Sequence, residues 1–190
     1  MANHIENYIV IENSNEEVLK EVQRVFQFEE GQYEVGSEEL VNRVFGKDAP
    51  KKYDRGWYHD NVGAKWLYGS IEDDSVEEQI IQITSAWDAI NGWVDRFAEN
   101  LQKIKDDVVV HNTFEDEGYN FAGVYFTAKY YDDVEMVDMD EYNVNMIWND
   151  DDVREKYHNN LYQIRIDHNE AYKNTLEDVK ENPKNYEQDI

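Results

Sequence analysis

The order of strand-like and helical runs is the feature of this sequence that most constrains its fold. Five runs have the alternation or the apolar, β-branched composition of strands, at residues 4–12, 66–72, 79–87, 108–114 and 121–130. Two longer runs, at residues 15–28 and from Asp88 to Ile104, carry apolar residues at the three- and four-residue steps of an amphipathic helix. The predicted order is therefore strand, helix, strand, strand, helix, strand, with one further strand after it.

That order predicts an α+β protein with a ferredoxin-like split βαβ sheet and helices on one face, plus an extra strand and a long C-terminal helix. Ser14 followed by Glu17 is a capping-box pattern for the first helix, and Asp88 is placed to cap the second. Composition assigns the remaining segments as a polar turn at residues 72–75, a loop at 46–60 and a shorter helix from Ser37.

Residues 131–152 differ in kind from the rest of the chain. Between Lys129 and Arg154 there is no basic residue, whereas acidic residues are frequent. Apolar residues are interleaved with them, so part of the segment is predicted to pack as a strand or a tight loop.

The C-terminal residues predict a long helix. From Val153 onward apolar residues recur at helical steps, and neither Gly nor Pro interrupts before Pro183. This predicts a helix of roughly 25 residues or more, capped by the acidic residues 150–152. The end of the chain is expected to fray. We expect a ferredoxin-like domain at residues 1–130, with an acidic segment and C-terminal helix at 131–190 packed on it or appended to it.

Three short motifs resemble those of a known family. Gly63-Ala64-Lys65-Trp66, Ser85-Ala86-Trp87 and Phe121-Ala122-Gly123, with Asn3 and Asn7, are similar to the motifs of the YubB-type ferredoxin-like domain family of phages and plasmids. The resemblance covers about residues 2–130, and the C-terminal third has no counterpart in it. It implies a ferredoxin-like fold and an origin in a mobile element, and it implies no reaction.

The sequence contains no motif of an enzyme, a metal site or a cofactor site. Cysteine is absent, which excludes thiolate nucleophiles and Cys-based metal sites. The five histidines lack metal-ligand spacing, and there is no P-loop, dinucleotide-binding glycine string or nucleophile elbow. Glu115 and Glu117 share one side of a predicted strand, for which a solvated face is favoured over an acid–base pair or a cation site. We expect a protein that is not an enzyme and needs no cofactor.

The tryptophans and the basic residues give little support for binding of nucleic acid. Trp57, Trp66, Trp87 and Trp93 could form an aromatic platform, but filling the core is the favoured interpretation. The one basic cluster, between Lys47 and Arg55, is expected to balance local acids. No direct contact with nucleic acid is therefore predicted.

The expected location is the cytoplasm of a bacterial host cell. The N-terminal residues lack the basic and apolar regions of a signal peptide, and no apolar run approaches the ~20 residues that span a bilayer.

The net charge is the most unusual property of the chain. Against 43 acidic residues there are 18 basic ones, giving −25. Such a field repels nucleic acid and anionic lipid and attracts basic surfaces, over ~8 Å at physiological salt. Solubility alone explains such a charge as well as function does. DNA, however, presents about one negative charge per 3.4 Å along each strand, which is close to the rise per residue of a β-strand. Acidic side chains in and around a strand and helix start within residues 131–152 could therefore occupy a protein's nucleic-acid-binding channel.

The leading hypothesis is a phage-encoded inhibitor that imitates nucleic acid and binds the basic surface of a host restriction enzyme, CRISPR effector or nuclease. One alternative is a small-molecule or metal-binding module that uses the Trp57–Trp66–Lys65 region, for which a pocket with Lys65 pointing inward would be the sign. Another is a structural protein that forms a homodimer through its C-terminal helix. The predicted partner-binding residues are Asp132, Asp133, Glu135, Asp138, Asp140, Glu141, Asp150, Asp151 and Asp152.

Overall fold

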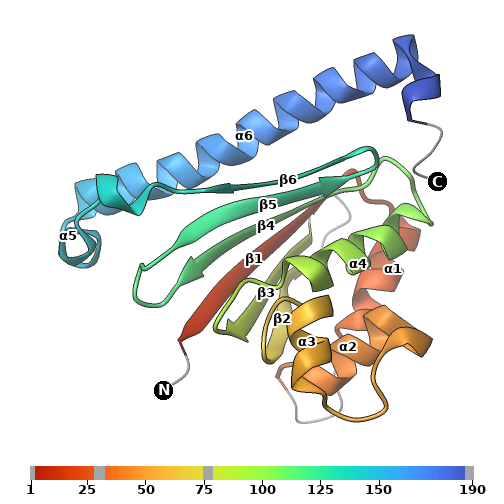
Figure 1. Cartoon of the computed structure of the whole chain (residues 1–190), viewed down its shortest axis with the longest axis horizontal. Coiled ribbons are helices and arrows are strands. Elements are labelled where there is room, and N and C mark those ends of the chain that lie inside the picture. Colours follow the sequence, from red (N-terminus) through yellow and green to blue (C-terminus); the bar gives the residue numbers. More distant parts are fainter. Residues whose placement is uncertain (1–2, 28–32, 75–78, 187–190) are drawn as a thin grey trace.

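The computed structural model describes residues 3–27, 33–74 and 79–186, and these form a mixed α+β protein (Figure 1). Six strands make one antiparallel sheet in the order β2-β3-β1-β4-β5-β6. The strands are β1 His4–Glu12, β2 Leu67–Asp74, β3 Gln79–Ala86, β4 Val109–Asp116, β5 Ala122–Ala128 and β6 Tyr131–Met136. The helices are α1 Glu16–Val25, α2 Ser37–Phe45, α3 Arg55–Asn61, α4 Asn91–Gln102, α5 Val144–Asn149 and α6 Asp151–Glu181, with 3₁₀ turns η1 Gly46–Asp48, η2 Met139–Glu141 and η3 Pro183–Asn185.

The register of β1 defines the inner face of the sheet. Its buried residues alternate with half-buried ones, as the period of a strand with one fully covered face requires. Ile9 lies opposite Ile81 of β3 and Asn112 of β4, and directly opposed residues point to the same side. The inner face therefore continues across the three central strands.

Helices α1 to α4 cover this inner face and form the main core with it. Trp93 and Phe97 of α4, which are inaccessible to solvent, pack with Val22 of α1, Leu40 of α2 and Ile9 of β1. The indole Nε1–H of Trp93 donates a hydrogen bond to the Leu40 carbonyl (3.2 Å), so this large ring is buried without an unpaired polar atom.

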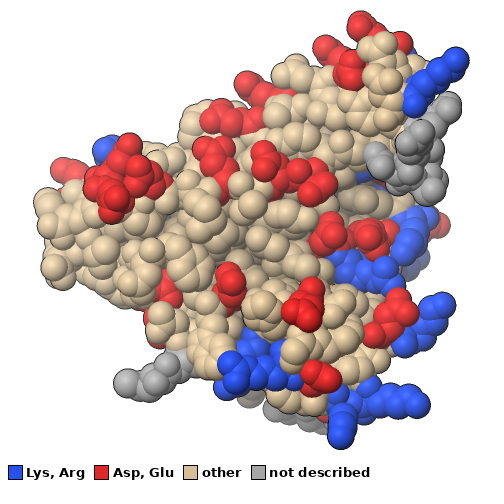
Figure 2. All heavy atoms as spheres, in the orientation of Figure 1, with Lys and Arg blue, Asp and Glu red and all other residues tan. Residues whose placement is uncertain are grey.

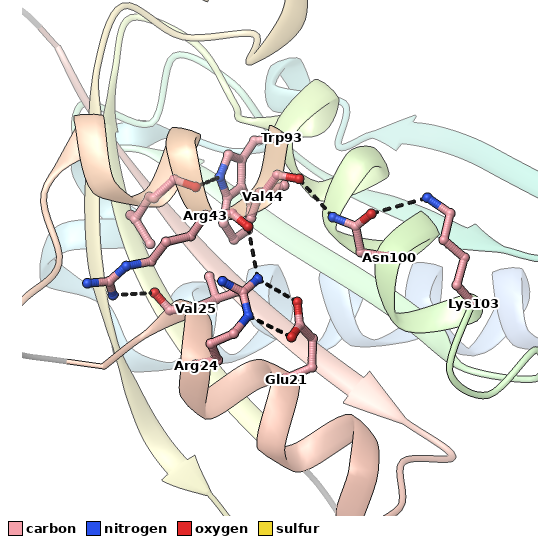
Figure 3. A network of polar contacts seen from close by, with 9 residues as sticks. Glu21, Arg24, Val25, Arg43, Val44, Trp93, Asn100 and Lys103 are labelled. Carbon is pink, nitrogen blue, oxygen red and sulfur yellow. Dashed lines mark hydrogen bonds and ion pairs between the residues drawn. The ribbon is translucent and has the colours of Figure 1, made fainter. Parts of the chain in front are cut away.

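Polar contacts fix the three longer helices of this layer to one another (Figure 3). The Arg24 guanidinium bridges the Glu21 carboxylate (2.6 Å) and the Arg43 carbonyl (2.9 Å), and Arg43 donates to the Val25 carbonyl (2.8 Å). The Asn100 amide of α4 donates to the Val44 carbonyl of α2 (2.8 Å). These bonds satisfy the free carbonyls at the ends of α1 and α2.

Helix α6 lies on the opposite face of the sheet (Figure 1). Strand β5 shows this directly, because its successive side chains point to opposite faces. Val124 packs against Leu161 and Ile164 of α6, whereas the hydroxyl of the next residue, Tyr125, donates to Asp95 of α4 (3.3 Å). The prediction that the helices lie on one face of the sheet therefore holds for α1 to α4. Helix α6 forms a second helical layer on the other face.

Several local predictions are corrected by the structure. Asn15 rather than Ser14 caps α1, because its carboxamide oxygen accepts from the backbone N–H groups of Glu17 and Val18. Helix α4 begins three residues after Asp88, whose carboxylate accepts from the adjacent Ala89 N–H.

Parts of the predicted loop, turn and frayed end are ordered. Helix α3 begins within the predicted loop 46–60, where Asp54 caps it by accepting from the N–H groups of Gly56 and Trp57. Strand β2 continues through Asp74, so most of the predicted turn is strand, and its remaining residue lies outside the described residues. At the C-terminus, Tyr186 donates to Asp178 (2.7 Å), which fixes the chain after α6; residues 187–190 lie outside the described residues.

Candidate functional site

The acidic residues 132, 133 and 135 lie on β6, at the edge of the sheet. This strand pairs with β5 on one side, and all its residues after Tyr131 are exposed. Charged side chains on an edge strand oppose pairing with another chain, which by itself accounts for some of this charge.

The pleat of β6 divides these three acids between the two faces of the sheet. Asp133 and Glu135 lie opposite Phe126 and Val124, on the α6 face, whereas Asp132 lies opposite Thr127, on the α4 face. Acids on one face are therefore two residues apart, roughly 6.6–6.8 Å. The distance between neighbouring acids approaches that between DNA phosphates only when the acids on both faces of β6 are taken together. A partner can contact both faces of a strand at an open edge of a sheet, but not in the middle of a sheet.

The other predicted acids lie in η2 and at the start of α6. Asp140 and Glu141 are exposed in η2, and Asp138 caps that turn by accepting from the Asp140 N–H (3.0 Å). Asp150 is half-buried and caps α6 by accepting from the N–H groups of Asp152 (3.0 Å) and Val153. Asp151 forms an ion pair with Arg154. Asp138, Asp150 and Asp151 thus have local structural roles.

The other six of the nine predicted acids cap no described helical turn, although Asp133 accepts from the adjacent Val134 N–H (2.8 Å). Within the described residues they form no ion pair: Asp132, Asp133, Glu135, Asp140, Glu141 and Asp152. We refer to the first five of these as the acidic edge. They lie on consecutive elements, because two residues, Val137 and Asp138, separate β6 from η2.

The charges are unevenly distributed over the molecule. Figure 2 shows acidic side chains over β6, η2 and α6, whereas most Lys and Arg side chains on this face gather over the α1–α4 layer. A cationic group stands beside the acidic patch near η2. Lys156 accounts for one cation there, because its Nζ lies 5.3 Å from the ring of Tyr142, the residue after η2.

A hollow of about 800 Å³ adjoins the acidic edge on the α4 side. Asp95, Glu99, Asp106 and Asp132 line it together with Lys129 and other residues. Burial and the neighbouring carboxylate of Glu99 raise the pKa of Asp95, although the hydroxyls of Tyr125 and Thr127 donate to it and oppose that shift. Sequence reasoning missed Asp95, because only the folding of α4 onto β5 places it beside Asp132.

The tryptophans do not form one platform. Trp93 is buried in the core, and Trp57 packs edge-to-face on Phe45 (5.0 Å between ring centroids). Trp66 stacks on Tyr68 (5.6 Å). Trp87, in contrast, is 45% exposed and lines a pocket of about 310 Å³ together with Lys65. The small-molecule alternative expects a pocket in the Trp57–Trp66–Lys65 region; of these residues, Lys65 lines this pocket, whereas Trp57 and Trp66 do not.

Glu115 and Glu117 line the same hollow of about 340 Å³, but their carboxylates make different contacts. Glu115 lies in β4, with its carboxylate 4.0 Å from the His158 ring, whereas Glu117 lies beyond β4 and contacts His4 (3.5 Å). Each carboxylate thus has a different partner.

One polar cluster joins α6 to the central strands. The Glu12 carboxylate lies 3.2 Å from His111 Nε2 and accepts from Arg165 of α6 (2.6 Å). The nearby His111 ring, supported by Arg165, lowers the pKa of Glu12 to about 2. Burial lowers the pKa of His111, which is inaccessible to solvent, and the Glu12 carboxylate opposes that shift. These groups anchor α6.

Within the described ranges, no set of three or more His, Asp or Glu side chains is placed to hold a metal ion. None of the helices there is both long and apolar enough to cross a bilayer.

Comparisons of the chain with protein-family models, with curated proteins and with solved structures gave no significant match.

Proposed function

We propose that the chain is a phage-encoded, non-enzymatic protein that binds the nucleic-acid-binding surface of a host defence protein through its acidic edge. The observation that carries the proposal is that this edge gathers exposed carboxylates, which form no ion pair with any residue that the structure describes, on the consecutive elements β6 and η2. A restriction enzyme, a CRISPR effector or a nuclease presents the complementary Lys and Arg side chains. The proposed site of action is the cytoplasm of the bacterial host.

Carboxylates of this kind suit a cationic partner. A carboxylate without an ion pair can accept charge-assisted hydrogen bonds from Arg or Lys without first breaking an internal one. The hollow beside Asp132 offers space for a side chain of the partner. Burial and Glu99 disfavour the charged form of Asp95 there, which raises its pKa, and a cationic side chain in the hollow would stabilise that charged form. Long-range attraction by the −25 net charge would speed the encounter.

A ferredoxin-like topology is part of the same proposal. Its support is the order β2-β3-β1-β4, with α1 to α3 inserted after β1 and α4 after β3. On this interpretation β5, β6, α5 and α6 are additions that carry the binding surface. The resemblance to the YubB-type family supports the scaffold and the mobile-element origin, and it leaves the binding surface to be explained by this chain alone.

The homodimer alternative has less support. Helix α6 turns its buried side chains toward the sheet: Tyr157, Leu161, Ile164, His168 and Tyr172. The apolar stripe that would join two copies is therefore already covered within one chain.

The test is affinity capture from a bacterial lysate by the wild-type protein and two variants, at low and at high salt. The first variant reverses four acids of the edge: Asp133→Lys, Glu135→Lys, Asp140→Lys and Glu141→Lys. The matched control reverses four exposed acids on the α1–α2 side: Glu16→Lys, Glu17→Lys, Glu34→Lys and Glu38→Lys. Both variants change the net charge equally, so any difference between them reports the position of the charge.

The proposal predicts that the wild type and the control retain one nucleic-acid-binding protein at low salt and release it at high salt. The edge variant does not retain it, and added DNA or RNA displaces it from the wild type. Equal retention by both variants would rule out the acidic edge as the binding surface. Circular dichroism of each variant checks that the fold is intact.

A further inference from the structure

A second site lies on the α1–α4 side of the molecule, away from the acidic edge, and Trp87 is its centre. Trp87 directly follows β3, and its φ is +77°. A bulky side chain rarely adopts this conformation, which costs about 1–3 kcal/mol. The strained backbone turns the indole outward, although the neighbouring Ala86 and Ala89 are buried.

Two cations lie against the exposed indole of Trp87. The Arg55 guanidinium carbon is 4.9 Å from the ring centroid, and the Lys65 Nζ is 4.6 Å from it. Both distances are within the ~6 Å range of a cation–π interaction. Helix α3 begins at Arg55, and a backbone hydrogen bond from Lys65 to the Ala86 carbonyl (3.3 Å) holds the second cation beside the end of β3.

Neither cation has a carboxylate partner in the described part of this acid-rich chain. Arg55 and Lys65 form no ion pair within the residues that the structure describes, although acidic residues outnumber basic ones by 43 to 18. Each of the other arginines is paired with Asp or Glu: Arg24, Arg43, Arg96, Arg154 and Arg165. Arg55 is therefore the exception among the described arginines. Lys65 is not exceptional in this respect, because among the described lysines ion pairs are printed for Lys105 and Lys129, but it lies beside the same ring as Arg55 and adds a second positive charge there.

The cations open onto the pocket of about 310 Å³, which is near the lower limit for a small-ligand site. Its lining consists of Arg55, His59, Gly63, Lys65, Ala86, Trp87 and Asp88. The one carboxylate among these residues, that of Asp88, accepts from the Ala89 N–H (2.8 Å). Gly63 has φ +96°, and a Cβ there would lie 2.5 Å from the Ala89 carbonyl oxygen, so only glycine permits this close approach of the chain. The wall of the pocket is thus set by backbone packing.

We propose that this pocket binds a phosphate monoester, with Arg55 and Lys65 holding the phosphate and Trp87 positioning the two cations. A phosphate monoester carries about −1.5 to −2 charges at pH 7, which suits two cations, whereas a single carboxylate needs one. Phosphate also matches the planar donor fork of arginine. The ligand is a free nucleotide or the terminal phosphate of a nucleic-acid strand. This site is independent of the acidic edge.

The test is titration of the ¹⁵N-labelled full-length protein, followed by NMR, with inorganic phosphate, AMP, and a short single-stranded oligonucleotide with and without a 5′-phosphate. We expect phosphate and AMP to shift the indole N–H signal of Trp87. Arg55→Gln and Lys65→Gln should each weaken binding about ten-fold, the usual effect of losing a charge-assisted hydrogen bond. Preference for AMP identifies the free nucleotide, and preference for the 5′-phosphorylated strand identifies a strand end.

Two controls make the outcome decisive. Lys51→Gln and Lys52→Gln remove the same charge from exposed residues near α3, and they should weaken binding less than two-fold, roughly the effect expected of a screened charge. Equal losses in these variants, equal binding of the unphosphorylated strand, or no shift at Trp87 would overturn the proposal. Trp87→Gly removes the ring where glycine is free to adopt φ +77°, so it should weaken binding without lowering the melting temperature. A large fall in that temperature would assign the ring a purely structural role.

Discussion

The two faces of the sheet are covered in different ways. On one face α1 to α4 bury a continuous apolar cluster around Trp93 and Phe97. On the other, α6 rests on two smaller clusters and is held partly by polar groups, among them the Glu12–Arg165 ion pair and the Tyr131–His168 contact (3.1 Å). From this difference we expect apolar burial on the α1–α4 face to contribute most of the free energy of unfolding. Attachment of α6 to the other face should depend more on interactions between charged and polar side chains.

The largest expected effect is on the α1–α4 face. Phe97→Ala should lower the free energy of unfolding by about 3–5 kcal/mol, because it leaves a cavity in the middle of the main cluster. Urea denaturation followed by circular dichroism measures this. A loss below about 1 kcal/mol would mean that this cluster does not dominate stability.

A smaller and more local effect is expected on the α6 face. Leu161→Ala should cost about 2 kcal/mol, the lower end for such a substitution, because its cluster is smaller and lies near the surface. Hydrogen exchange should speed up along α6 while the amides of β1 and β3 stay protected. Equal acceleration in both layers would contradict the division into a stable and a less stable face.

The difference between the faces should also appear as a dependence on pH. The pKa of Glu12 in the folded protein is lowered from 4.5 to about 2, so its contribution is complete above pH 4.5 and is lost as the pH falls toward 2. The pKa of His111 is lowered from 6.5, so its protonation also opposes folding as the pH falls below 6.5. Glu12→Gln should reduce the loss of stability between pH 5 and pH 2 by about 1 kcal/mol, allowing for its partial exposure. Identical pH profiles of the wild type and the variant would argue against this anchor.

The smallest effect on stability is expected at the acidic edge. Reversal of Asp133, Glu135, Asp140 and Glu141 to Lys should leave the free energy of unfolding unchanged or raise it by up to about 1 kcal/mol, because it relieves repulsion at exposed positions. Thermal denaturation at low salt measures this. A loss of several kcal/mol would mean that these carboxylates hold the fold together instead of facing a partner.

Much of the α1–α4 face could be predicted from the sequence, because its apolar residues repeat with the period of the element that contains them. Strand β1, with Ile5, Ile9 and Ile11 at alternate positions, is an example. Helix α3 was missed because its seven residues are too few to show a helical period and include Gly56. The sequence of β6 fits a strand or a loop equally, because both its faces are exposed and only pairing with β5 defines it.

The candidate sites were predicted less completely, for a related reason. Nine acids could be selected by composition, but composition does not distinguish Asp138 and Asp150, which cap helical turns, from Asp133 and Glu135, which have no such role. The contribution of Asp95 to the hollow, and the meeting of Arg55, Lys65 and Trp87, arise from tertiary packing and from one backbone torsion. No spacing in the sequence encodes them.

The most direct test of the acidic edge is the association rate with the captured partner, measured at several salt concentrations for the wild type, the edge variant and the matched control. If the edge guides binding, the edge variant associates about ten-fold more slowly at low salt and shows a flatter dependence on salt, whereas the control resembles the wild type. Wild-type rates and salt dependence in the edge variant would contradict the account.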